Sequence, residues 1–313
     1  MMGQRSWLVM VLFTACLALE QVACAPSGSG SSGDSPGGTG ASCDFTMQGA
    51  QQSCSLGGRT SLLYLPPASC GGPLPIVIYL HGAPGGISEG NNNGWPATAA
   101  KDCFIEVNAK GSLLKTGVES WHIYNDSNNY TGTPPDDVAQ LKSVVADLEA
   151  GTSVDPKAVF AVGFSVGGFM ASRVAAEAGD VFAATFPWAA TLYMQGAGGT
   201  TGLPSSVSAP TNMEEMNGAA DTTIPICGLT NSSVTISSVD MALDWWMTVL
   251  GCTTATPATS ICAGGQPVLT AKTLSGCKGG VTVEWSSVAG VSHSWPTGLN
   301  DTVWSYFNAH RKP

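Results

Sequence analysis

Ser165 is the residue whose surroundings most clearly indicate chemistry. It lies in the pattern Gly-Phe-Ser-Val-Gly at 163–167, directly after the apolar run at 158–162. A buried strand, then Gly-x-Ser-x-Gly, then a helix is typical of a serine nucleophile at a sharp strand-to-helix turn. Gly163 and Gly167 are expected to be glycine because a Cβ there would collide with neighbouring backbone. The pattern also arises by chance in glycine-rich chains, so its interpretation depends on an accompanying base and acid.

A serine hydroxyl becomes a useful nucleophile only when a base removes its proton and an acid orients that base. The chain has four histidines. His293 is the candidate base, because it lies on a loop after 281–286, whose β-branched and alternating residues predict a strand. His310 is interpreted as a helix-end residue near the C-terminus, His122 as structural, and His81 as a residue that holds its loop by a side-chain hydrogen bond.

The acid is expected between Ser165 and His293, at the end of another strand. Asp221 fits, since it ends the segment Gly-Ala-Ala-Asp at 218–221. An aspartate near glycine is also common in ordinary turns, which is the alternative reading of Asp221. The other acidic residues in this interval are Glu177, Asp180, Glu214, Glu215, Asp240, Asp244 and Glu284.

Acyl transfer also needs hydrogen-bond donors for the oxyanion of the transition state. The backbone N–H of Val166 is one candidate, because it lies at a predicted helix N-terminus. The second is expected on the His-Gly turn after the predicted strand at 75–80. Pro84 has no N–H, so Gly82 and Ala83 are the candidates there.

These segments together resemble the polyhydroxybutyrate depolymerase and feruloyl esterase group of the α/β-hydrolases, which also includes acetylxylan esterases. The matching segments, which span residues 57 to 310 in the family's order, are Leu80-His81-Gly82, Asp136-Asp137-Val138, Val154-Asp155-Pro156, Gly163-Phe164-Ser165-Val166-Gly167-Gly168, Gly218-Ala219-Ala220-Asp221 with Ile224-Pro225, and His293-Ser294-Trp295-Pro296. The resemblance implies that Ser165 is the nucleophile, His293 the base and Asp221 the orienting acid. The family usually has Asn at 166 and His at 217, and these departures bear on acyl-group preference.

Alternating predicted strands and helices indicate an α/β fold, the α/β-hydrolase fold, with a mostly parallel sheet covered by helices on both faces. Strands are predicted near 59–65, 75–81, 103–108, 157–163, 183–188, 211–217, 267–273 and 281–287, and helices near 94–101, 135–150, 166–178, 237–250 and 300–310. The second helix is predicted to start at Pro135, with Val138, Leu141, Val145 and Leu148 along one face.

The chain is predicted to comprise a signal peptide (1–24), a Gly/Ser/Pro-rich linker (25–42) and a single catalytic domain (43–313). The apolar run after Arg5 is too short for a membrane span. Two endings of the signal are open: ordinary cleavage, or lipid attachment at Cys24. Gln21 suits the lipoprotein pattern poorly, so we favour free secretion, with a lipid-anchored outer-surface protein as the alternative.

The even number of cysteines outside the predicted signal peptide favours an oxidising compartment. Ten cysteines less Cys16 and Cys24 leave eight, and an even set in an exported chain predicts disulfides rather than metal ligands or reactive thiols. The spacing does not give the pairing; the resemblance implies a bridge between Cys252 and Cys277. No metal and no cofactor are expected.

The formal net charge of −10 argues against a nucleic-acid partner. Trp295, two residues past His293, and Trp188, at the end of a strand, are expected to line the substrate site, although Trp188 reads equally as core. The resemblance implies a serine esterase acting on a polymeric ester: feruloyl or acetyl groups of plant cell-wall polysaccharide such as xylan, or short-chain polyhydroxyalkanoate polyester. We expect this enzyme to be secreted and monomeric. The alternative is an inactive surface lipoprotein that binds carbohydrate.

Overall fold

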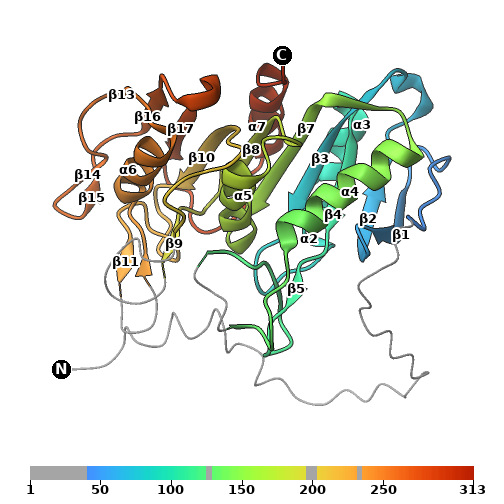
Figure 1. Ribbon diagram of the computed structural model, residues 1–313, viewed down its shortest axis with the longest axis horizontal. Coiled ribbons are helices and arrows are strands. Elements are labelled where there is room, and N and C mark those ends of the chain that lie inside the picture. Colours follow the sequence, from blue (N-terminus) through green and yellow to red (C-terminus); the bar gives the residue numbers. More distant parts are fainter. Residues whose placement is uncertain (1–40, 125–128, 195–202, 231–234) are drawn as a thin grey trace.

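A ten-stranded sheet forms the centre of the molecule (Figure 1). The computed structural model describes residues 41–124, 129–194, 203–230 and 235–313; the predicted signal peptide with Cys24, and most of the predicted linker, lie outside these ranges. In spatial order the strands are β1 (Gln51–Leu56), β2 (Arg59–Tyr64), β4 (Ile105–Ala109), β3 (Leu74–Leu80), β7 (Val154–Phe164), β8 (Ala184–Trp188), β10 (Asn212–Gly218), β17 (Val283–Val288), β16 (Ala271–Ser275) and β13 (Thr254–Thr256). Neighbouring strands from β4 through β17 pair parallel, and the strands at both edges pair antiparallel.

Helices cover both faces of this sheet, as predicted. They are α2 (Glu89–Asn92), α3 (Trp95–Asp102), α4 (Asp137–Gly151), α5 (Val166–Glu177), α6 (Val239–Leu250) and α7 (Leu299–Ala309). Side chains of α4, α5 and α6 pack on one face, and those of α3 and α7 on the other (Figure 1). Shorter elements are β5 (Ser112–Leu113), β6 (Glu119–Ser120), β9 (Tyr193–Met194), β11 (Leu229–Thr230), β12 (Thr235–Ile236), β14 (Cys262–Ala263), β15 (Gln266–Pro267), η1 (Ala68–Cys70) and η3 (Lys278–Gly280).

Every strand and helix predicted from the sequence is present, with shifted ends. Helix α4 begins at Asp137 and not at Pro135, because the side chain of Asp136 caps it by accepting a hydrogen bond from the Ala139 N–H at 3.0 Å. Strand β16 begins at 271 and not at 267. Strand β1 was not predicted, since its mostly polar sequence QQSCSL carries little strand signal.

The parallel arrangement determines where a site can form. Strands β3, β7, β10 and β17 run in the same direction, so the loops that follow Leu80, Phe164, Gly218 and Val288 leave from the same edge of the sheet. The carboxyl ends of parallel strands are where open α/β sheets bind ligands. The predicted nucleophile, acid, base and oxyanion turn all lie on these four loops.

Four disulfides connect the cysteines of the described region. The pairs are Cys43–Cys54, Cys70–Cys103, Cys227–Cys262 and Cys252–Cys277. The prediction of disulfides is therefore confirmed, and so is the bridge between Cys252 and Cys277. None of the helices within the described ranges has the length and apolar character needed to cross a bilayer.

Candidate active site

Ser165 lies between the end of β7 and the start of α5, in a strained backbone conformation. Its φ of 55° and ψ of −119° are unusual for a residue with a side chain. The turn is tight because a Cβ on Gly163 would lie 2.0 Å from the Gly167 carbonyl oxygen, and a Cβ on Gly167 would lie 1.9 Å from that of Leu80. The Ser165 N–H donates to the Trp188 carbonyl at 3.0 Å, which anchors the turn to β8. The sharp turn presents the Ser165 side chain above the sheet edge.

The structure brings Ser165, His293 and Asp221 together in one hydrogen-bonded row. Nε2 of His293 lies 3.0 Å from the Ser165 hydroxyl, and Nδ1 lies 2.7 Å from Oδ2 of Asp221. The imidazole of His293 is 17% exposed, whereas the Asp221 side chain is fully buried. A buried carboxylate on Nδ1 favours the tautomer in which Nε2 is free to accept the serine proton.

Backbone hydrogen bonds in two loops hold Asp221 and His293 in position relative to each other. Oδ1 of Asp221 accepts the backbone N–H groups of Thr223 and Ile224 at 2.8 and 2.9 Å, so the other oxygen is left for His293. The Ala220 N–H donates to the Val291 carbonyl at 2.9 Å, which ties the acid loop directly to the base loop. The carboxylate position is thus determined by backbone as well as by the histidine.

Of the predicted oxyanion donors, the structure leaves two available and removes one. Val166 is the first residue of α5, so its N–H has no partner within the helix. The Gly82 N–H donates to Oε2 of Glu89 at 2.9 Å, so the prediction that Gly82 could serve as donor is wrong. Ala83 is the remaining candidate on this turn, and within the described residues its N–H has no hydrogen-bond partner. The turn lies against the serine: a Cβ on Gly82 would be 3.4 Å from the Ser165 Cβ.

His81 holds this turn in place, as the sequence indicated. Its Nε2 accepts the Gly111 N–H at 3.1 Å, which requires the proton to be on Nδ1, and Nδ1 therefore donates to the Gly82 carbonyl at 2.7 Å. Burial lowers the pKa of His81, which keeps the ring neutral. The Trp121 indole N–H donates to the His81 carbonyl at 2.9 Å. His81 is a fixed support and not a second base.

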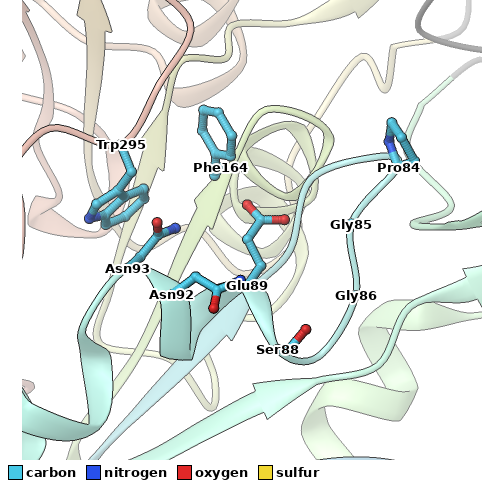
Figure 2. A pocket seen from close by; sticks show the side chains of 9 residues that line it. All are labelled: Pro84, Gly85, Gly86, Ser88, Glu89, Asn92, Asn93, Phe164 and Trp295. Atoms are coloured by element: carbon cyan, nitrogen blue, oxygen red, sulfur yellow. The ribbon is translucent and has the colours of Figure 1, made fainter. Parts of the chain in front are cut away.

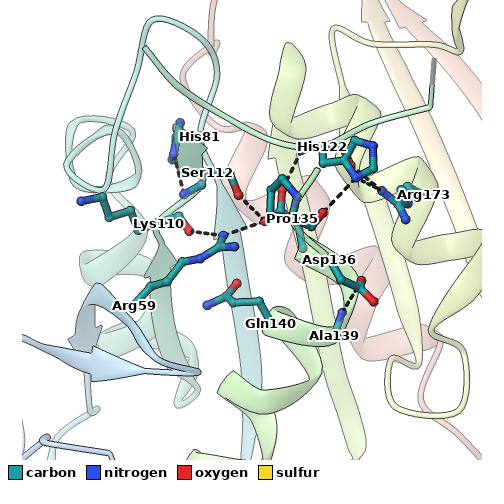
Figure 3. A network of polar contacts seen from close by, with 12 residues as sticks. Arg59, His81, Lys110, Ser112, His122, Pro135, Asp136, Ala139, Gln140 and Arg173 are labelled. Carbon is teal, nitrogen blue, oxygen red and sulfur yellow. Dashed lines mark hydrogen bonds and ion pairs between the residues drawn. The ribbon is translucent and has the colours of Figure 1, made fainter. Parts of the chain in front are cut away.

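A polar network around the Arg59–Asp137 ion pair is linked to His81 through the segment 110–112 (Figure 3). The Asp137 carboxylate, fully buried, accepts hydrogen bonds from Arg59, the Ser112 hydroxyl and the His122 backbone N–H, each at 2.6 Å. His122 is thus part of the scaffold, and its Nδ1 lies 2.9 Å from the Pro135 carbonyl. His310 is the C-cap residue of α7, as predicted.

A pocket of about 350 Å³ opens beside the hydrogen-bonded row. Its lining residues are Pro84, Gly85, Gly86, Ser88, Glu89, Asn92, Asn93, Phe164 and Trp295. Figure 2 shows Phe164 and Trp295 on one side and the loop at 84–86 on the other, with the Glu89 carboxylate between them. Trp295, predicted to line the substrate site, lines this pocket, and its indole N–H donates a hydrogen bond to the Asn300 side chain at 2.8 Å.

Two residues differ from expectation here. Trp188 is fully buried and donates its indole N–H to the Ser294 carbonyl, so the prediction that it lines the substrate site is wrong. Glu89 was not predicted, because a carboxylate on a four-residue helix carries no recognisable sequence signal. In the described part of the chain, no group of three or more His, Cys, Asp or Glu side chains could hold a metal ion.

Comparisons with known proteins find an esterase-like relative, a feruloyl esterase and a polyester depolymerase. The chain is 33% identical over 133 residues to NocK of Nocardia uniformis subsp. tsuyamanensis, provisionally named an esterase (41% of this chain, 37% of NocK). It is 24% identical over 226 residues to feruloyl esterase B of Piromyces equi (70% and 39%). It is 27% identical over 119 residues to poly(3-hydroxyalkanoate) depolymerase C of Paucimonas lemoignei (38% and 28%). No family model matches the chain.

The solved structure of acetyl xylan esterase from Aspergillus awamori superposes with a TM-score of 0.50 at 16% identity, covering 80% of this chain and 93% of that one. The fold is that of the α/β-hydrolases, and the relatives match the group that the sequence motifs indicated. The chain spans well under half the length of the curated relatives it matches.

Proposed function

We propose that this protein is an exported serine esterase that hydrolyses carboxylic esters, with Ser165 as nucleophile, His293 as general base and Asp221 as orienting acid. The observation that carries the proposal is the continuous row from the Ser165 hydroxyl through His293 to the buried Asp221. A histidine with a purely structural role does not require a serine in a strained backbone conformation next to one ring nitrogen and a buried carboxylate next to the other. Two relatives with esterase names and one named as a polyester depolymerase support the same reaction class.

The reaction proceeds in two halves. In the first, Nε2 of His293 takes the proton as Oγ of Ser165 bonds to the ester carbonyl carbon; the resulting oxyanion accepts the N–H groups of Val166 and Ala83. Collapse of this intermediate breaks the bond to the alcohol oxygen, which receives the proton from His293 and leaves. In the second half a water molecule attacks the acyl-enzyme in the same way, which releases the acid and restores Ser165.

The substrates we propose are feruloyl or acetyl esters of plant cell-wall polysaccharide, or short-chain polyhydroxyalkanoate polyester. Relatives with names of both kinds support this range. Four disulfides support an oxidising, exported location, where such polymers are met. Free secretion is proposed over lipid attachment at Cys24.

Hydrolysis of p-nitrophenyl acetate and butyrate by the purified protein tests the proposal. Ser165→Ala should abolish turnover without unfolding the protein, whereas Ser143→Ala, on α4, should retain it. A fluorophosphonate probe should add its mass to the wild type and not to Ser165→Ala. No turnover by the wild type together with no labelling would instead favour an inactive carbohydrate-binding protein.

A further inference from the structure

The pocket beside the hydrogen-bonded row combines aromatic and hydrogen-bonding surfaces. Phe164 and Trp295 provide aromatic rings, and Ser88, Glu89, Asn92 and Asn93 provide polar groups. Among these lining residues Glu89 alone is ionisable. Pockets that bind small organic groups commonly have this composition, with a few polar groups that select the ligand.

The pocket lies next to the ring of His293, the residue that returns a proton to the leaving alcohol. His293 must return its proton to the oxygen of the leaving alcohol, so that oxygen has to be on the His293 side of the scissile bond. The Phe164 ring lies 4.9 Å from the His293 ring, and 6.3 Å from the Trp295 ring. Both Phe164 and Trp295 line the pocket. This space is therefore within reach of an alcohol that takes its proton from His293.

The Glu89 carboxylate is held in place and keeps hydrogen-bonding capacity. Its Oε2 accepts the Gly82 N–H at 2.9 Å, and its Oε1 accepts the Tyr79 hydroxyl at 3.1 Å. Tyr79 is itself fixed by the Asn93 side-chain amide at 2.7 Å. A carboxylate offers about four lone-pair directions. Two fixed donors leave acceptor capacity directed at a ligand in the pocket.

A ligand with hydroxyl groups fits the polar side chains of this pocket, because a hydroxyl both donates and accepts hydrogen bonds. A sugar hydroxyl can donate to Glu89 and accept from the Asn92 amide, while the apolar side of a sugar ring can pack on Trp295. A polyester repeat carries only hydrocarbon and acceptor oxygens. It would offer no donor to the lone pairs of Glu89 that Gly82 and Tyr79 leave unused, and it would bring acceptor oxygens close to the carboxylate. A site built to hydrogen-bond a hydroxyl discriminates strongly against an analogue that lacks it.

We propose that this pocket is the subsite for the leaving alcohol, and that Glu89 and Asn92 make it select a saccharide alcohol over an alcohol without further hydroxyls. This inference rests on the esterase function proposed above and deepens it, because it favours polysaccharide esters over polyester.

The experiment compares two esters with the same acyl group: acetylated xylo-oligosaccharide and ethyl acetate. The readout is the ratio of their kcat/KM values. Because Glu89 also anchors Gly82, Glu89→Gln will alter oxyanion stabilisation for both esters, and this common effect cancels in the ratio. The wild type should prefer the saccharide ester, and Glu89→Gln should lower that preference about tenfold, as expected for one hydrogen bond to a charged group.

Two further variants keep the test decisive. Asn92→Ala, at an exposed position at the end of α2, should also lower the saccharide preference without touching the Gly82 anchor. Glu119→Gln, which removes a nearby carboxylate outside the pocket lining, should leave the ratio unchanged. If Glu89→Gln does not fold, Asn92→Ala decides.

The outcomes separate the two proposals. An unchanged ratio in both pocket variants, or a wild type that prefers ethyl acetate or polyhydroxybutyrate film, would overturn the subsite assignment while leaving the esterase function intact. A wild type that hydrolyses no ester, p-nitrophenyl acetate included, would overturn the esterase function itself.

Discussion

Gly218 leaves no room for a side chain, because its Cβ would lie 2.3 Å from the carbonyl oxygen of Val291. This contact joins the end of β10 to the loop that carries His293. Together with the hydrogen bond from the Ala220 N–H to the same carbonyl, it sets the separation between the acid loop and the base loop. The distance from Asp221 to His293 therefore depends on a glycine that takes no part in the chemistry.

Gly218→Ala should force these loops apart and lower kcat/KM for p-nitrophenyl acetate by about 10²-fold, as expected for a displacement on the order of 1 Å. Gly290→Ala is the comparison, since a Cβ there meets no atom within 4 Å even though its φ is +72°. That variant should lose stability and keep most of its activity. Equal activity losses in the two variants would contradict the role of the Gly218 contact.

Asp221→Asn should retain the fold and lower kcat by on the order of 10⁴, by analogy with the serine protease triad, because an amide holds the histidine in the wrong tautomer. Steady-state kinetics and a thermal melt would measure the two effects separately. Retention of more than about a tenth of the wild-type kcat would mean that another carboxylate orients His293. Glu89, whose carboxyl lines the pocket next to His293, would then be the residue to mutate.

A disulfide that closes a longer loop should stabilise the fold more, with the logarithm of the loop length. In the chain-entropy treatment, the bridge Cys227–Cys262, with a sequence separation of 35, contributes about 4 kcal/mol, and Cys43–Cys54, with a separation of 11, about 3 kcal/mol. Paired Cys→Ser variants in denaturant titrations should show this order. Detection of eight reactive thiols in the unfolded, unreduced protein would exclude the disulfides altogether.

Two buried carboxyls should make the protein most stable at mildly acidic pH. Burial raises the pKa of Glu106 and of Glu215 from 4.5 to about 8 in the folded state. The folded protein therefore binds more protons than the unfolded chain between these values, so the free energy of unfolding should fall as pH rises from about 4.5 to about 8.

Thermal melts of variants would measure this dependence. Glu106→Gln and Glu215→Gln should each flatten the fall of Tm between pH 5 and pH 8, because the amide does not titrate. Glu149→Gln, at an exposed position on α4, should leave the slope as it is. A wild-type Tm that rises across this interval would show that other groups dominate.

The local arrangement around Ser165 could be predicted because short-range sterics encode it. In this chain Gly163 and Gly167 allow the strand and the following helix to approach so closely that a Cβ at either position would collide with backbone, so the turn follows from residues near Ser165. Only four histidines had to be considered for the base, and the loop after a late strand singled out His293. Parallel strands then place the loops after β3, β7, β10 and β17 at one edge without further information.

Contacts between distant segments were decided only by the tertiary structure. Trp188 ends a strand and could have faced solvent, but the base loop covers it and accepts its indole hydrogen bond. From the sequence, the Gly82 N–H could have been available to the oxyanion. In the structure it donates a hydrogen bond to the Glu89 carboxylate, and no local sequence pattern predicts that contact. The sequence by itself determined the turn, the order of the reactive residues and most elements. Packing determined which backbone N–H groups remain free and which aromatic rings line the pocket, because both depend on side chains brought together across the sheet edge.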